Sequence, residues 1–167
     1  MGLKILAGII IGGYVLFGIF RMLKLKKASK EVTKEYNWKT DKDKFKKEFI
    51  QLITEKPNLN YLVISFDKYY IQFMGWENIK EFYCETISNE FLEAPNQLND
   101  VKIKKIIELK FLEPNSRDSN GNTSPNYSKF YRAGNNTERG NIFKEIEFIL
   151  NKIYEIKSNE ILKVRHE

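Results

Sequence analysis

Two carboxylates and a thiol stand close together between residues 79 and 88. Glu81 and Glu85 share one face of a strand with a period of two, and paired carboxylates can act as general acid and base. Cys84 could act as a nucleophile, but such a cysteine needs a histidine partner, and the chain's only histidine is His166, the penultimate residue. An enzyme would therefore need an unrecognised site built from Glu81, Cys84 and Glu85.

Other catalytic signatures are missing from the sequence. It has no glycine-rich phosphate loop, no G-x-S-x-G elbow and no H-E-x-x-H motif. One cysteine and one histidine cannot supply the four ligands of a structural zinc ion. We therefore predict a protein that is not an enzyme and that binds neither metal nor cofactor, and we keep the enzyme as an alternative hypothesis.

Polar side chains next to aromatic ones indicate a contact surface instead. At protein interfaces, aromatic residues anchor the partner and polar groups set its position. The residues that we predict to bind a partner protein combine these two types: Tyr70, Gln72, Trp76, Tyr83, Glu85 and Asn89.

The elements that would position these residues follow from hydrophobic periodicity. Apolar residues at helical spacing predict a helix from about Asp41 to Pro57, another after Asn99, and a last one in which isoleucines recur from Ile142 to Ile156. Alternating residues predict three strands joined by short turns over 61–66, 69–74 and 79–88, and a fourth strand over 127–133. Residues 115–126 have the composition of an exposed loop.

This order of elements predicts an α+β fold, a two-layer sandwich of helices on an antiparallel sheet. Alternation also assigns the faces of the sheet. The face toward the helices should hold Leu62, Ile64 and Phe66 of one strand, with Tyr69, Ile71 and Phe73 of the next. Tyr70, Gln72 and Met74, with Tyr83 and Glu85, should then lie on the opposite face.

Three short patterns within residues 41–157 resemble the TY-Chap and YbjN-like group of bacterial domains. The patterns are a Tyr-x-Gln-aromatic strand (Tyr70, Gln72, Phe73), a Glu-x-x-Ser-Asn-x-x-Leu run (Glu85, Ser88, Asn89, Leu92) and a Leu-x-Phe-x-x-Pro step (Leu109, Phe111, Pro114). The chain has Lys110-Phe111 where such domains tend to show Gly-Trp. The resemblance implies the fold of type III secretion chaperones and a protein-binding role without known chemistry.

The N-terminal segment reads as a membrane anchor. Residues 5–20 carry no charge, and residues 3–23, at about 1.5 Å per residue, would span roughly 30 Å of bilayer as a helix. Gly8 and Gly12 form a small-xxx-small pair of the kind that packs membrane helices, which makes a homo-oligomer one possibility. We therefore predict that residues 1–23 are a transmembrane anchor whose partner is the lipid bilayer.

Charge defines the expected orientation and the remaining boundaries. The net charge of the chain is +6, but residues 21–47 alone hold eleven basic and four acidic residues, which leaves −1 for the rest. Basic residues after the span predict an extracytoplasmic N-terminus and a domain in the cytoplasm, at the inner membrane of a bacterium. We expect a basic linker over 24–40, a domain over 41–157 and a polar tail over 158–167. A near-neutral domain argues against nucleic acid as a partner.

Together these observations predict a single-pass membrane protein whose cytoplasmic domain is a protein-binding adaptor or chaperone-like module. A second hypothesis is an immunity or defence component that holds a toxin or effector at the inner membrane. The sequence has the same features under both, and it does not identify the partner.

Overall fold

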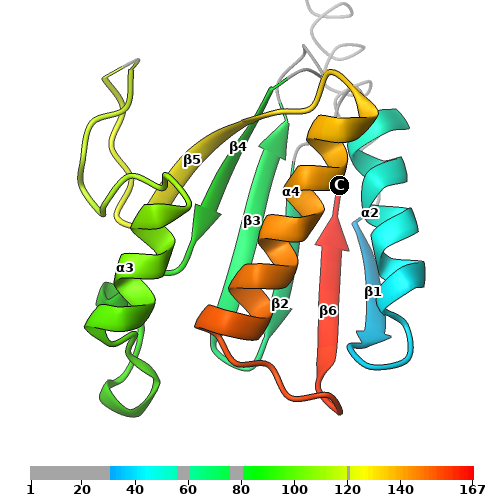
Figure 1. Cartoon of the computed structure of the whole chain (residues 1–167), viewed down its shortest axis with the longest axis horizontal. Helices are drawn as coiled ribbons and strands as arrows, with labels where there is room; N and C mark the ends of the chain where they lie inside the picture. Colours follow the sequence, from blue (N-terminus) through cyan, green and yellow to red (C-terminus); the bar gives the residue numbers. More distant parts are fainter. Residues whose placement is uncertain (1–30, 56–60, 76–80, 120) are drawn as a thin grey trace, which may run out of the picture. The chain divides into compact units, whose positions relative to one another are not determined.

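The computed structural model describes residues 31–55, 61–75, 81–119 and 121–167 of the 167-residue chain. This part has an α+β fold with a six-stranded antiparallel sheet (Figure 1). The strands, in chain order, are β1 (Val32–Asn37), β2 (Leu62–Phe66), β3 (Tyr69–Gly75), β4 (Glu81–Thr86), β5 (Tyr127–Arg132) and β6 (Ile161–His166). In the sheet they lie in the order β1-β6-β2-β3-β4-β5.

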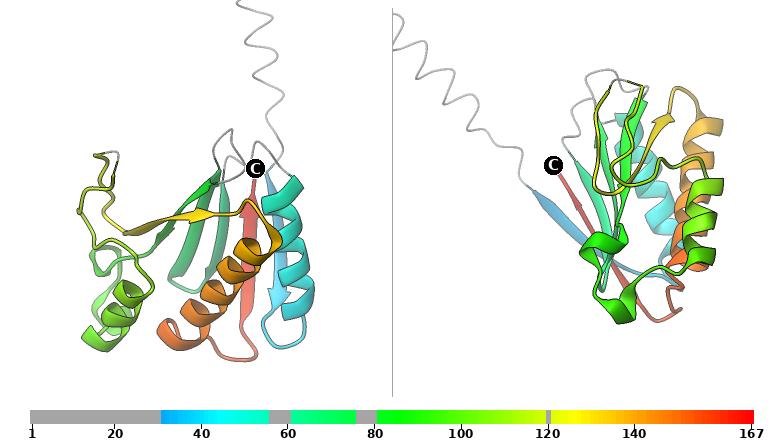
Figure 2. Two further views of the ribbon diagram at one scale, coloured as in Figure 1. Left: turned by 45° about the horizontal axis from the view of Figure 1, so that its top comes forward. Right: turned by 90° about the vertical axis from the view of Figure 1, so that its left-hand side faces the viewer.

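The helices lie on one face of this sheet (Figure 2, right). They are α2 (Lys42–Glu55), α3 (Asp100–Glu108) and α4 (Asn136–Phe148), and α4 continues into one π-helical turn, η3 (Ile149–Ile153). Two short 3-10 turns, η1 (Asn89–Phe91) and η2 (Ala94–Asn96), lead into α3. The predicted α+β class and the antiparallel sheet are therefore confirmed.

The core lies between the helices and the sheet and is rich in aromatic rings. Phe49 of α2 packs with its ring centroid 5.5 Å from that of Phe73 in β3 and 5.8 Å from that of Phe143 in α4. Burying a side chain of this size stabilises the fold by about 1.5–3 kcal/mol relative to leaving it in water. Contacts among α2, β3 and α4 therefore hold the two layers together.

The predicted helices and strands are largely confirmed. Asn99 accepts a hydrogen bond from the backbone N–H of Lys102, which caps α3. Asn135 and Glu138 form a capping box at the start of α4. The isoleucines from Ile142 to Ile156 are buried as expected, although the regular α-helix ends at Phe148 and the π-helical turn carries the stripe onward.

Two predicted boundaries are wrong. Residues 24–40 were expected to form a linker, but Val32–Asn37 is strand β1, and Trp38 is buried with its Nε1 donating to Asn151. Residues 158–167 were expected to form a polar tail, but Ile161–His166 is strand β6, which pairs with both β1 and β2. The compact unit therefore runs from Glu31 to Glu167.

The membrane prediction concerns residues 3–23, including Gly8 and Gly12, which lie outside the described residues. Among the helices that the structure describes, none has both the length and the apolar character that crossing a bilayer requires. The anchor therefore stays a prediction from the sequence.

Candidate functional site

The face of the sheet that turns away from the helices is the candidate site, and we call it the open face. Strand pairing aligns its residues in rows across the sheet: Val63, Gln72, Glu85 and Ser128 form one row, and Met74, Tyr83 and Phe130 form another. The alternate residues Leu62, Ile64, Ile71 and Phe73 are buried on the helix side, as predicted. The open face thus carries the residues that alternation predicted for it, namely Tyr70, Gln72, Met74, Tyr83 and Glu85.

An aromatic patch occupies the β4–β5 side of the open face. The rings of Tyr83 and Phe130 pack with centroids 5.1 Å apart, and Phe130 remains 36% exposed. Leu112 is also 36% exposed, and it pairs with Ser128 at the outer edge of β5, which places it in the row of Glu85 and Ser128, next to the row of Tyr83 and Phe130. We call Met74, Tyr83, Leu112 and Phe130 the aromatic patch.

Glu85 connects the aromatic patch to the loop that precedes β5. Its Oε1 accepts a hydrogen bond from the Tyr83 hydroxyl at 3.1 Å and another from Ser124 Oγ at 2.6 Å. Burial, with a further contribution from the Glu85 charge, raises the pKa of Tyr83, so its hydroxyl stays protonated and donates at neutral pH. The carboxylate and the ring are therefore held in one arrangement before any partner binds.

The opposite side of the open face is hollowed and more basic. A shallow depression of about 230 Å³ lies over β2, β3 and β6 and is lined by Val63, Ser65, Tyr70, Gln72 and Arg165, among others. Burial is the main cause that raises the pKa of Tyr70, so this hydroxyl is also neutral. The depression can take a side chain of a partner, with Arg165 as its cationic wall.

Four of the six predicted partner-binding residues come together on the open face, namely Tyr70, Gln72, Tyr83 and Glu85. Asn89 does not join them. It lies in η1, and its side-chain amide makes two hydrogen bonds with the backbone of Leu98, at 2.7 and 2.8 Å. These bonds fix the loop before α3, so Asn89 has a structural role. Trp76 lies outside the described residues.

The residues of the enzyme hypothesis are separated by the sheet. Cys84 is fully buried on the helix side, whereas Glu81 and Glu85 lie on the open face. Burial raises the pKa of the Cys84 thiol well above its ordinary value, which keeps it neutral. The three side chains therefore do not form one site.

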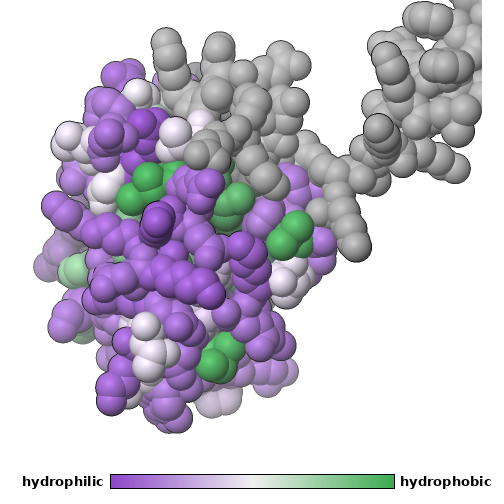
Figure 3. Space-filling model, turned by 90° about the vertical axis from the view of Figure 1, so that its right-hand side faces the viewer, coloured by the Kyte–Doolittle hydropathy of each residue, from purple (hydrophilic) through white to green (hydrophobic). Residues whose placement is uncertain are grey.

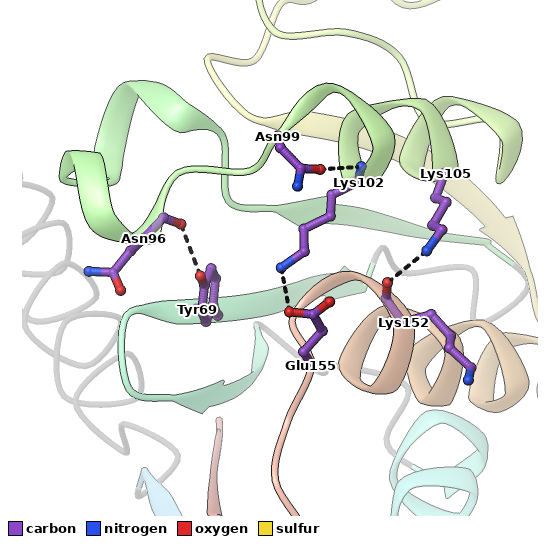
Figure 4. A network of polar contacts seen from close by, with 7 residues as sticks. All are labelled: Tyr69, Asn96, Asn99, Lys102, Lys105, Lys152 and Glu155. Atoms are coloured by element: carbon purple, nitrogen blue, oxygen red, sulfur yellow. Dashed lines mark hydrogen bonds and ion pairs between the residues drawn. The ribbon is translucent and has the colours of Figure 1, made fainter.

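A polar network bounds the site at the start of β3 (Figure 4). The Tyr69 hydroxyl donates to the Asn96 carbonyl at 2.9 Å, and Lys102 of α3 forms an ion pair with Glu155 at 2.9 Å. Lys105 donates to the carbonyl of Lys152. Tyr69 also stacks on Tyr154, with centroids 4.5 Å apart, so its ring packs toward the helix side, although Tyr69 also lines the depression beside Tyr70.

Comparisons of the chain with protein-family models, with curated proteins and with solved structures find no match. The resemblance to the TY-Chap and YbjN-like group therefore stays a prediction.

Proposed function

We propose that this chain is a single-pass membrane protein whose domain binds another protein through the open face, without catalysis. The observation that supports this most is the aromatic patch, where the exposed ring of Phe130 and the half-buried ring of Tyr83 lie next to a carboxylate already held by hydrogen bonds. Buried aromatic anchors of this kind commonly contribute more than 2 kcal/mol each to a protein interface.

The charges of the open face favour a protein partner over a polyanion. Arg132, Lys163 and Arg165 are matched by the acidic residues Glu35, Glu81 and Glu85. Arg132 lies 3.8 Å from Glu81, and Lys163 lies 3.9 Å from Glu35, so two of the cations already have counter-ions. A nucleic acid needs a basic stripe, whereas a protein surface of mixed polar and apolar character suits a face with balanced charges.

Removing an aromatic anchor should weaken partner capture. We expect Phe130→Ala, and likewise Tyr70→Ala, to reduce capture at least tenfold, because each removes about 1.4 kcal/mol or more of interface energy. The measurement is quantitative mass spectrometry of proteins cross-linked in cells to the full chain and purified with it.

Phe148→Ala is the matched control, since Phe148 on α4 is 37% exposed, nearly the same as Phe130, but lies in the helical layer. Its set of captured proteins should equal that of the unaltered chain. If Phe148→Ala and Phe130→Ala reduce capture of the same protein equally, the open face is not the binding site.

The anchor and its orientation form the second part of the proposal. The basic residues after position 20 support a cytoplasmic domain. We expect a green fluorescent protein fused after Glu167 to fluoresce, and alkaline phosphatase fused there to be inactive. An active phosphatase fusion would place the domain outside and reverse the orientation. Release of the chain from membranes by salt or carbonate would reject the anchor itself.

A further inference from the structure

A second hollow lies on the flank of the domain, between β1 and α2. Its volume is about 680 Å³, nearly three times that of the depression on the open face. Its walls come from Val32, Lys34, Lys44, Lys47, Glu48, Gln51, Leu52 and His166. Figure 3 shows the flank of the domain that carries α2 and β1, where hydrophilic side chains predominate and a few hydrophobic residues lie between them.

The charge of this hollow is positive. Three of its lining residues are lysines, and Glu48 is its single lining carboxylate. The Glu48 Oε2 atom already accepts hydrogen bonds from Lys34 at 2.5 Å and from the Tyr36 hydroxyl at 2.7 Å. In the described part of the chain, Lys44 and Lys47 have no acidic partner within ion-pair distance. Lys44 and Lys47 therefore face the hollow without a direct ion pair, although the Lys44 charge is one of the causes that lower the pKa of Glu48, after the hydrogen bonds from Lys34 and Tyr36.

Not every lysine of α2 lines the hollow, and Lys46 is the contrasting case. Its Nζ lies 5.8 Å from the ring of Phe143 in the helical layer, and it does not line the hollow. Lys44 and Lys47 are three residues apart, so they share the side of α2 that faces β1. The hollow thus combines two exposed lysines with an apolar wall from Val32 and Leu52, and the Lys44 Nζ atom lies 6.0 Å from the ring centroid of Tyr36.

The position of the hollow in the chain would allow it to reach the predicted bilayer. Val32 lies nine residues after Leu23, the end of the predicted span. Nine residues reach at most roughly 30 Å when fully extended, at about 3.3–3.6 Å each. The hollow is therefore tethered within reach of the lipid headgroups, the most concentrated source of phosphate diesters at that surface.

We propose that the hollow between β1 and α2 binds the phosphate group of an anionic lipid of the membrane that anchors the chain, with Lys44 and Lys47 as its ligands. This inference rests on the proposed anchoring of residues 3–23 and is independent of the open face. An ammonium group near an anionic bilayer contributes about 1 kcal/mol, which corresponds to about fivefold in affinity.

Lysine footprinting of the full chain in lipid nanodiscs tests this proposal. Discs of phosphatidylcholine alone are compared with discs that contain 30% phosphatidylglycerol, and acetylation rates are read by mass spectrometry. We expect acetylation of Lys44 and Lys47 to slow at least fivefold in the anionic discs, while that of Lys46 changes less than twofold. In the Lys44→Gln variant, protection of Lys47 should drop below twofold, and Lys46→Gln should leave it unchanged.

The other outcomes overturn the proposal in distinguishable ways. Equal protection of Lys44, Lys46 and Lys47 means general attraction to the surface and no built site. Protection in phosphatidylcholine discs by inorganic phosphate or by a short oligothymidylate, without an effect of phosphatidylglycerol, means that the ligand is not the lipid. If the chain does not enter the discs at all, the proposed anchoring fails first, and the failure is visible in gel filtration before any lysine is modified.

Discussion

Deleting residues 158–167 should abolish cooperative folding of the domain. β6 pairs on one side with all six residues of β1 and on the other side with β2, and Leu162 and Val164 are completely or almost completely buried. Without β6, β1 has no strand partner and the edge of β2 is open. The lost burial of these two residues alone is about 3–6 kcal/mol, in a domain whose total stability is expected to be about 5–15 kcal/mol.

The test compares the truncated and unaltered chains in detergent by limited proteolysis and by the near-ultraviolet circular dichroism of Trp38 and the core tyrosines. The control is the double variant Lys163→Gln and Arg165→Gln, which alters the same strand on the open face and should keep both signals. A truncated chain that resists protease as well as the unaltered one would show that β6 is not needed and that residues 158–167 behave as a tail.

Phe73→Ala should lower the free energy of unfolding by about 3–5 kcal/mol. Phe73 is 1% exposed, and its ring lies 5.5 Å from that of Phe49 and 6.0 Å from that of Tyr131. Replacing the Phe73 ring with a methyl group leaves a cavity between Phe49 of α2 and Tyr131 of β5. Because these neighbouring rings are held by different elements, they can close the cavity only in part. Urea unfolding followed by tryptophan fluorescence measures the change.

Tyr70→Ala is the informative comparison, because Tyr70 lies three residues earlier on the same strand but on the open face. We expect it to cost about 1–2 kcal/mol, since its half-buried ring packs against fewer neighbours. If Tyr70→Ala destabilises the domain more than Phe73→Ala does, the two faces of β3 are assigned the wrong way round, and the proposed binding site moves with them.

The sequence predicts the central part of the fold because its signals there are local. In β2 and β3 the inward positions hold Leu62, Ile64, Ile71 and Phe73, so alternation is clear, and short turns fix the pairing. β1 lacks this signal: as an edge strand it buries only Tyr36 among its six residues. β6 does alternate, but Lys163, Arg165 and His166 make half of it ionisable, so its composition resembles that of a polar terminus.

The sequence predicts the residues of the candidate site only where they lie on the hairpin of β3 and β4. Tyr70, Gln72, Tyr83 and Glu85 come from adjacent strands, and their pairing follows from a short connection. Phe130 and Leu112 complete the aromatic patch from segments that meet through pairing distant in sequence, and no local pattern specifies that register. Asn89 lies apart from the open face, and its structural role could not be predicted, because its residue type suits an interface as well as a loop and the two hydrogen bonds to Leu98 appear only in the structure.

The pairing of β1 with β6 also sets the order of events during synthesis. Of the six strands that the structure describes, β1 is the first to leave the ribosome and β6 is the last, with 123 residues between Asn37 and Ile161. At about 5–20 residues per second, β1 waits on the order of 10 s for its partner, and the edge of β2 stays open for nearly as long. Long-range pairing of this kind also folds slowly. Nascent chains should therefore depend on ribosome-associated chaperones until β6 emerges, and chains that stall before residue 161 should expose two strand edges that mark them for degradation.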